Sequence, residues 1–165
     1  MTVILKRNSG TTLIEILISL LILSVGMLGM LELQIVSLRS NHGTWLRTQA
    51  TMFGMDIGER MRANFQGVEA GSYDQSSGAL IATCLMGVGC TPAQMAAHDV
   101  FEWRTQLAEV LPMGSGIVCL DATGYDGTSE LTACDGAGSL YAIKVWWDDN
   151  RDGIASHRYT AIYRP

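Results

Sequence analysis

The hydrophobic pattern of the chain begins with an apolar run long enough to cross a bilayer. From Thr11 to Leu31 the only charged residue is Glu15. At a helical rise of about 1.5 Å per residue, this run spans about 30 Å, the thickness of a membrane's hydrocarbon core. Lys6 and Arg7 precede it, and positive charge on that side predicts a cytoplasmic N-terminus. No small-residue cleavage pattern follows Leu31, so we predict that the run is retained as an anchor.

Apolar residues continue beyond the run at intervals of mostly three or four, which predicts that the helix goes on. The members of this stripe are Leu31, Ile35, Leu38, Trp45, Met52, Phe53, Ile57 and Met61. Polar residues between them provide a solvent-facing side. We therefore predict one helix of about fifty residues, apolar over residues 11–38 and amphipathic over residues 39–65.

A second helix is indicated after a Gly- and Ser-rich segment, residues 66–90, which predicts a loop. Thr91, Pro92 and Gln94 have the spacing of an N-cap, a first-turn proline and a capping box. Pro112 marks the end of this helix.

Three later segments have the pattern of β-strands: residues 117–120, 140–147 and 159–163. Turn-forming residues at 148–153 join the last two. The simplest arrangement of these elements is an antiparallel sheet of three or four strands packed on the long helix. We predict an α+β fold whose head occupies residues 66–165.

Composition narrows the class of protein. The 11 basic and 16 acidic residues give a net charge of -5, which argues against non-specific binding of nucleic acid. A hydrophobic content of 48% with only 16% charged residues excludes a disordered chain. From Asn64 onward there are 12 acidic and 5 basic residues, so we expect the head to bind a partner with a basic face.

The four cysteines, Cys84, Cys90, Cys119 and Cys134, predict two disulfides in an exported head. No Cys-x-x-Cys motif occurs, so neither a zinc site nor a thioredoxin-like site is supported. Three pairings are possible. We favour Cys84–Cys90 with Cys119–Cys134, because each bond closes a local, Gly-rich loop.

Other candidate chemistry is sparse. Asp148, Asn150 and Asp152 begin a calcium-loop pattern, but Tyr159 stands where the bidentate Glu belongs, so a hairpin loop is favoured over a calcium site. His98 has no Cys or His at ligand spacing, and we expect it to be a solvated helix residue. No motif of a hydrolase, a phosphate loop or a zinc protease occurs. We expect neither enzymatic activity nor a cofactor.

The start of the chain also carries a resemblance. Residues 6–15, Lys-Arg-Asn-Ser-Gly-Thr-Thr-Leu-Ile-Glu, resemble the class III signal of type IV pilins and pseudopilins. Residues 20–29 and 59–64, and less clearly 90–94, are similar to the PilV-type minor pilins, also called type IV pilus modification proteins.

The resemblance implies roles for three residues. A prepilin peptidase would cut after Gly10 and methylate the new N-terminus at Thr11, where most relatives carry Phe. By physical chemistry alone, Glu15 either lies near the membrane surface or meets a cation. The resemblance favours the second, since the matching pilin glutamate is thought to pair with a neighbouring subunit's N-terminal amine.

In functional terms, the resemblance implies a minor pilin that primes type IV pilus assembly with other minor pilins. It would be incorporated at or near the pilus tip and would support piliation, twitching motility and adhesion. The expected partners are other minor pilins, the major pilin, the prepilin peptidase, the inner-membrane assembly platform and membrane lipid, but no nucleic acid. The expected location is the inner membrane, with the N-terminus cytoplasmic and the head periplasmic, and then the pilus fibre.

The implied division of the chain is a leader at residues 1–10, an anchor and assembly half at 11–38, an amphipathic half at 39–65 and a head at 66–165. The nearer alternative is a minor pseudopilin of a type II secretion system, which shares the fold and the processing. The farther alternative is a membrane-anchored enzyme or sensor with an unrelated head.

Overall fold

The computed structural model describes residues 12–87 and 89–165. Contacts divide the chain after His42 into an N-terminal unit and a head unit that runs from Gly43 to Pro165. One helix, α1 (Thr12–Ala63), begins in the first unit and ends in the second. Its 52 residues agree with the single long helix predicted from the apolar stripe.

Among its described residues, the head unit contains three further helical segments: α2 (Phe65–Glu69), the 3₁₀ helix η1 (Ala82–Leu85) and α3 (Pro92–Val110). The sequence prediction of a plain loop over residues 66–90 is therefore wrong in detail. Asn64 starts α2 because its side chain accepts a hydrogen bond from the backbone N–H of Gly67. At the start of α3, Thr91 and Gln94 form the predicted capping box.

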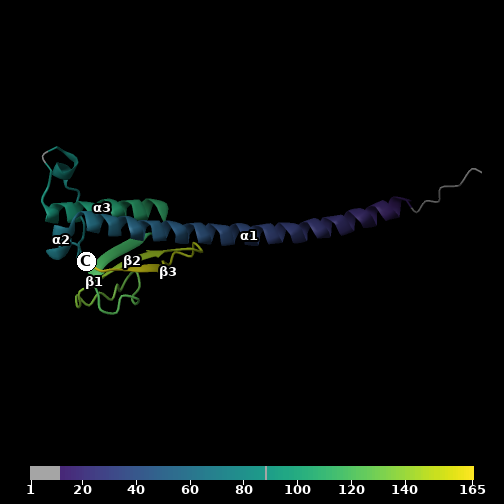
Figure 1. Ribbon diagram of the computed structural model, residues 1–165. Coiled ribbons are helices and arrows are strands. Elements are labelled where there is room, and N and C mark those ends of the chain that lie inside the picture. The colour runs from purple at the N-terminus through teal and green to yellow at the C-terminus, as the bar shows by residue number, and fades with distance from the viewer. Residues whose placement is uncertain (1–11, 88) are drawn as a thin grey trace, which may run out of the picture. The chain divides into compact units, whose positions relative to one another are not determined.

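Three antiparallel strands complete the head: β1 (Ser115–Leu120), β2 (Tyr141–Trp147) and β3 (His157–Tyr163). They lie in the order β1-β2-β3, so β2 is the central strand. The register places Ile143 of β2 opposite Val118 on one side and Ala161 on the other. Figure 1 shows α3 beside the later part of α1, with the sheet below both helices. The predicted α+β fold is confirmed.

The core of the head fills the space between the sheet, α3 and the part of α1 from Gly43 to Ala63. Every second residue of β2, from Tyr141 to Trp147, belongs to it. Trp103 of α3 is fully buried in this core, and its indole N–H donates to the carbonyl of Phe53 at 2.9 Å. The indole thus joins two helices through one aromatic side chain and one hydrogen bond.

The other face of the sheet is covered as well, because β2 is buried along its whole length. Ala142, Lys144 and Trp146 point away from the helix-side core. The segment of residues 121–140, here named the cover loop, lies over this face (Figure 1) and binds Lys144 through Asp126 and Thr132. Because both faces of the sheet are covered, β2 is buried along its whole length and is almost entirely apolar, with Lys144 as its one charged residue.

Candidate functional site

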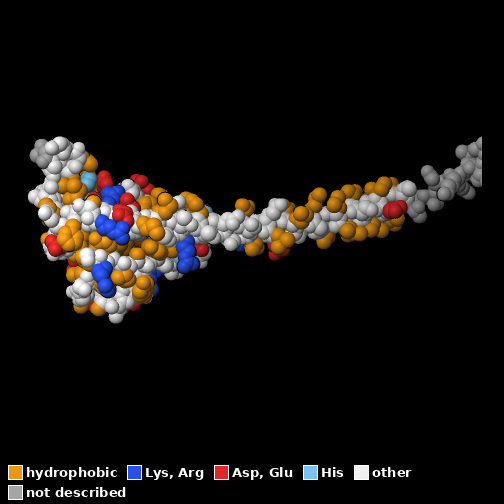
Figure 2. Space-filling model, in the orientation of Figure 1, with side chains coloured by type: hydrophobic (Ala, Val, Ile, Leu, Met, Phe, Trp, Pro, Cys, Tyr) orange, Lys and Arg blue, Asp and Glu red, His pale blue; other side chains and the backbone are white. Residues whose placement is uncertain are grey.

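The first candidate site is the apolar part of α1 in the N-terminal unit. Every large apolar side chain from Leu13 to Leu38 is between 51% and 72% exposed. By length and composition, α1 is able to cross a membrane, and none of its apolar window is buried within the chain. Figure 2 shows the apolar side chains that line this part of the helix. Such a surface is stable only in lipid or against other apolar helices.

Two serine hydroxyls within this segment are hydrogen-bonded to the helix itself. The hydroxyl of Ser19 donates to the carbonyl of Glu15 at 2.7 Å, and the hydroxyl of Ser24 donates to the carbonyl of Leu21 at 2.8 Å. Backbone carbonyls of the same helix therefore accept the hydroxyl protons that lipid could not.

Glu15 lies in the first turn of α1, and its side chain is exposed. A carboxylate there faces the positive end of the helix dipole. The proposed cleavage and methylation residues, Gly10 and Thr11, lie outside the described residues. Of the three candidate residues Gly10, Thr11 and Glu15, the structure therefore describes Glu15 alone.

The second candidate site is the pair of disulfides in the head. The structure joins Cys84 to Cys90 and Cys119 to Cys134, which is the pairing favoured from the sequence. The bonds span 6 and 15 residues of sequence. Chain entropy predicts stabilisation of about 2 kcal/mol for the shorter loop and about 3 kcal/mol for the longer.

The shorter disulfide loop is held against α3 by two hydrogen bonds. The backbone N–H of Ala79 donates to the carbonyl of Ala97 at 2.9 Å, and that of Ile81 donates to Nδ1 of His98 at 3.2 Å. His98 is only 4% exposed, so the prediction of a solvated histidine is wrong. Helix position alone could not indicate that the preceding loop folds back over this residue.

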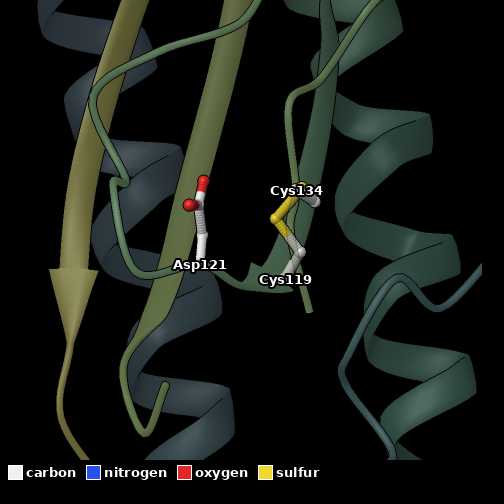
Figure 3. Close-up of side chains that lie close together, drawn as sticks. All are labelled: Cys119, Asp121 and Cys134. Carbon is white, nitrogen blue, oxygen red and sulfur yellow. A yellow bond between two sulfur atoms is a disulfide. The ribbon is translucent and has the colours of Figure 1, made fainter. Parts of the chain in front are cut away.

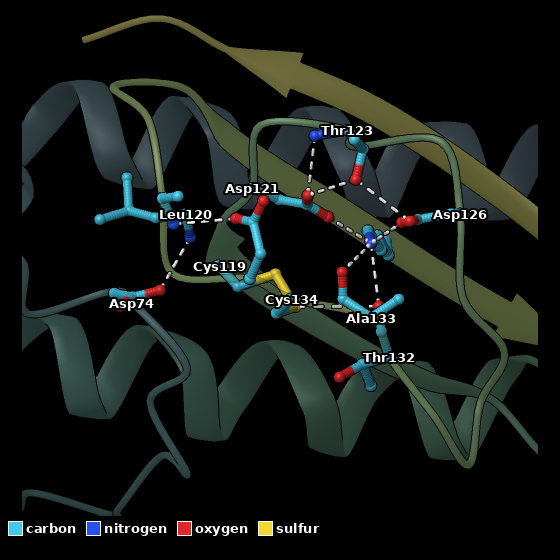
Figure 4. Close-up of a disulfide and its surroundings, with 12 residues drawn as sticks. Asp74, Cys119, Leu120, Asp121, Thr123, Asp126, Thr132, Ala133 and Cys134 are labelled. Carbon is cyan, nitrogen blue, oxygen red and sulfur yellow. Dashed lines mark hydrogen bonds and ion pairs between the residues drawn. A yellow bond between two sulfur atoms is a disulfide. The ribbon is translucent and has the colours of Figure 1, made fainter.

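The longer disulfide ties the cover loop to the end of β1 (Figure 4). The residue before Cys134, Ala133, has its carbonyl 3.5 Å from Nζ of the buried Lys144. Nζ of Lys144 lies 2.5 Å from Oδ2 of Asp121 and 3.0 Å from Oδ1 of Asp126. It also donates to the carbonyl of Thr132 at 2.8 Å. A buried ammonium group needs this number of acceptors to offset its lost hydration. The cover loop thus supplies the partners that allow a charged residue inside the sheet.

Asp121 is ionised in this arrangement. Burial alone would raise the pKa of its carboxyl group, but Lys144 and the N–H and hydroxyl of Thr123 stabilise the carboxylate and hold the pKa below its ordinary value. The carboxylate of Asp126 also accepts from Lys144, which lowers its pKa. The cluster is a set of ion pairs, here named the lock, that holds the cover loop against β2.

Metal binding is not supported at this position. Cys119, Asp121 and Cys134 are the described residues grouped closely enough to suggest an ion site. Figure 3 shows that the two sulfur atoms are bonded to each other beside Asp121. Thiolates are the form of cysteine that binds metals, and the disulfide removes both.

The loop after β2 contains the weak calcium candidates. Both carboxylate oxygens of Asp148 accept backbone N–H groups, from Arg151 at 2.6 Å and from Gly153 at 2.8 Å. The side-chain amide of Asn150 donates to Asp152 at 2.9 Å. These bonds are those of a side-chain-stabilised turn. The geometry therefore gives the loop a structural explanation that needs no ion.

A third cluster, which the sequence analysis did not find, joins α1 to α3. Arg60 lies 3.0 Å from Asp56, 2.9 Å from Glu102 and 3.5 Å from Asp99. The hydroxyl of Tyr73 donates to Asp99 at 2.5 Å. The hydrogen bond from Arg60 lowers the pKa of Glu102, whereas burial and the contact with Asp99 raise the pKa of Tyr73.

This third cluster has the properties of a clamp. Its cation, Arg60, pairs with carboxylates of two helices, Asp56 of α1 and Glu102 of α3, and so holds the helices together. The signal in the sequence is the i, i+4 spacing of Asp56 and Arg60. The partners on α3 are distant in sequence and could not be paired with Arg60 from spacing alone.

Comparisons with known proteins agree with this arrangement. The family model described as "Type IV pilin Tt1218" matches residues 32–101. The prokaryotic N-terminal methylation motif matches residues 5–31, directly before it. No curated protein and no solved structure matches the chain. The two adjoining matches, together with an apolar N-terminal helix and a small antiparallel sheet, make the chain similar to type IV pilins and support a pilin with a prepilin N-methylation motif.

Proposed function

We propose that this chain is a minor pilin of the PilV type, which primes type IV pilus assembly with other minor pilins and enters the fibre at or near its tip. The observation that carries the proposal is the exposed apolar part of α1. This apolar part follows the proposed leader, which ends in Gly10. From Thr11 to Leu31 its only charged residue is Glu15. In this role it would support piliation, twitching motility and adhesion.

The proposed path of the subunit follows from its polarity. Lys6 and Arg7 keep the N-terminus in the cytoplasm, the apolar segment stays in the inner membrane, and the disulfide-bonded head is periplasmic. The prepilin peptidase then cuts after Gly10 and methylates Thr11. The assembly platform of the inner membrane moves the processed subunit into the fibre.

Glu15 supplies selectivity in this step. A helix that leaves lipid for a helix bundle exchanges one apolar environment for another, so hydrophobicity contributes little to the transfer. A carboxylate costs about 2.5–3.5 kcal/mol at the bilayer centre on insertion scales, and less near the interface, to which the first turn of α1 is closer. An ion pair between Glu15 and the N-terminal amine of a neighbouring subunit would offset that cost and fix the axial register.

The first experiment measures the intact mass of the purified membrane protein from cells with and without prepilin peptidase. We expect the chain to begin at Thr11 only in cells that have the enzyme, and a methyl group on Thr11 is visible in the same spectrum. A chain that begins at Met1 in both strains contradicts the proposal. The variant Gly10→Val should remain uncut, whereas the neighbouring Ser9→Ala should be cut normally.

A second experiment separates pilus assembly from type II secretion. Deletion of the gene should reduce the number of surface pili and abolish twitching, and the tagged chain should co-purify with minor pilins. Normal piliation, together with co-purification of secretion components, would contradict the pilus role and favour the pseudopilin alternative.

A further inference from the structure

The two edges of the sheet in the head differ in how many of their backbone groups are hydrogen-bonded to other parts of the chain. The outer edge of β1 is sealed by other parts of the chain. The N–H of Gln75 donates to the carbonyl of Val118 at 2.9 Å, and Nε of Arg104 donates to the carbonyl of Gly116 at 2.9 Å. The N–H of Leu120 donates to the carboxylate of Asp74 at 2.7 Å. This edge therefore has few backbone groups left for a partner.

The outer edge of β3 is open by comparison. In the described part of the chain, β3 has one strand neighbour, β2, and none of the backbone hydrogen bonds that seal β1 has a counterpart on it. Its segment His157–Tyr163 contains no proline and only one Lys or Arg. Edge strands that avoid pairing usually carry such residues, so β3 lacks the ordinary protection.

A groove runs beside this open edge, between β3 and α1. Gly54 and Gly58 of α1 line it together with Tyr159 and Ala161 of β3. The ring of Tyr159 packs against Gly54, and Ile143 is the nearest side chain to Gly58, so the two glycines let the sheet come close to α1. The groove has a volume of about 130 Å³. Small-molecule sites usually measure about 300–1,000 Å³. The groove is therefore too small for a cofactor and suits a single apolar side chain.

The rim of the groove carries no net charge. Glu59 and Arg62 both line it, and they pair with each other. Met55, also on the rim, is 61% exposed. A membrane-binding face would carry an excess of Lys and Arg. The neutral rim instead suits an uncharged segment of protein.

We propose that the edge of β3 and the adjoining groove bind an extended, uncharged segment of a neighbouring pilin subunit. The segment adds to the sheet beside β3 through main-chain hydrogen bonds and places one apolar side chain in the groove. The identity of the partner rests on the proposed function, because a fibre places pilin heads next to one another. The open edge, the volume and the neutral rim are independent of it.

The test is photo-crosslinking of the full chain in cells that assemble the fibre. A benzophenone amino acid replaces Ile162, which is 37% exposed on β3, or Leu131, which is 77% exposed on the cover loop. We expect a crosslinked partner at position 162 that itself carries a prepilin leader. We expect at most about a tenth of that yield at position 131. A similar yield at both positions, or capture at 162 of a protein that is not a pilin, overturns the proposal.

A matched pair of charge variants tests the groove. Met55→Lys places a positive charge on the rim of the groove. Met52→Lys places the same charge elsewhere on α1, at a residue that is 58% exposed and does not line the groove. Both side chains are exposed, so both variants should fold. We expect Met55→Lys to lower the yield at position 162 about tenfold, because a charge must be desolvated beside an apolar side chain. Equal yields from the two variants contradict docking in the groove.

The same samples distinguish failure of this proposal from failure of the proposed function. The mass of the recovered chain shows whether residues 1–10 have been removed. A processed chain without a specific crosslink at position 162 refutes the docking surface and leaves the pilin role intact. A chain that is never processed refutes the pilin role, and with it the identity of the partner.

Discussion

Nζ of Lys144 lies 2.5 Å from Oδ2 of Asp121, and neither side chain is exposed to solvent. The lysine belongs to the central strand and the aspartate to the cover loop. The pair therefore attaches the loop to the sheet at a point that the Cys119–Cys134 disulfide does not reach directly. Breaking such a buried pair leaves one charge without compensation.

We predict that Lys144→Met lowers the free energy of unfolding by about 3–5 kcal/mol, because Asp121 remains buried without its cation. The double variant Lys144→Met with Asp121→Leu should recover much of this loss. The measurement is urea unfolding of the full chain in detergent, followed by tryptophan fluorescence. Arg62→Ala, which breaks an exposed pair with Glu59, is the control and should cost at most about 1 kcal/mol. A loss for Lys144→Met no larger than the control's would contradict the lock.

The dependence of stability on pH follows from the lowered pKa of Asp121. Its pKa in the unfolded chain is about 3.9, so its stabilising contribution is complete above about pH 5. The contribution is lost as the pH falls through the lower pKa of the folded state. In Lys144→Met the buried carboxylate of Asp121 no longer has a cation, so its protonation at low pH removes the uncompensated charge. We expect the difference between wild type and variant to be smaller at pH 3.5 than at pH 7; a constant difference contradicts this assignment.

Two glycines one turn apart in α1 should respond in opposite ways to alanine. A Cβ on Gly54 would collide with Cε1 of Tyr159, whereas one on Gly58 would lie 3.7 Å from Cδ1 of Ile143, at ordinary contact distance. Gly54→Ala should therefore destabilise the head by about 1–3 kcal/mol through overpacking. Gly58→Ala should stabilise it by up to about 1 kcal/mol through helix propensity. Thermal unfolding of the two variants checks both signs, and equal shifts would contradict the packing of Tyr159.

Glu15 and Glu32 are a matched pair of carboxylates on α1, and both are exposed. Under the proposed function, Glu15→Gln removes the charge that pairs with a neighbour's N-terminal amine. It should insert and be processed normally, yet reach sheared pili at a level about tenfold below wild type. Glu32→Gln should be incorporated normally. Immunoblots of sheared pili and of membranes measure both levels, and equal incorporation would argue against a special role for Glu15.

Much of the fold could be predicted because local chemistry decides it. Thr91, Pro92 and Gln94 indicate the start of α3, and the alternation in residues 140–147 indicates β2. The long helix follows from a stripe of apolar residues that no proline interrupts. Each of these signals lies within a few residues of the element that it predicts.

The errors arise where distant segments meet. The sequence predicted a solvated His98, but the loop around Ile81 covers it. Nothing in the spacing of Asp56 and Arg60 shows that Glu102 completes the ion pair from another helix. Lys144 lies on the face of β2 away from the helix-side core, and its burial depends on the cover loop, whose path has no periodic signal. The docking groove depends likewise on β3 passing the two glycines of α1.

The disulfides have a consequence for how the head becomes oxidised. Both native bonds join cysteines that are neighbours in the sequence, at separations of 6 and 15 residues, and either alternative pairing would close longer loops. Short loops close more often than long ones in an unfolded chain, so the correct partners meet first. Neither bond involves α1. Under the proposed function, an exported head can therefore form both bonds without a shuffling enzyme while α1 is still held in the membrane.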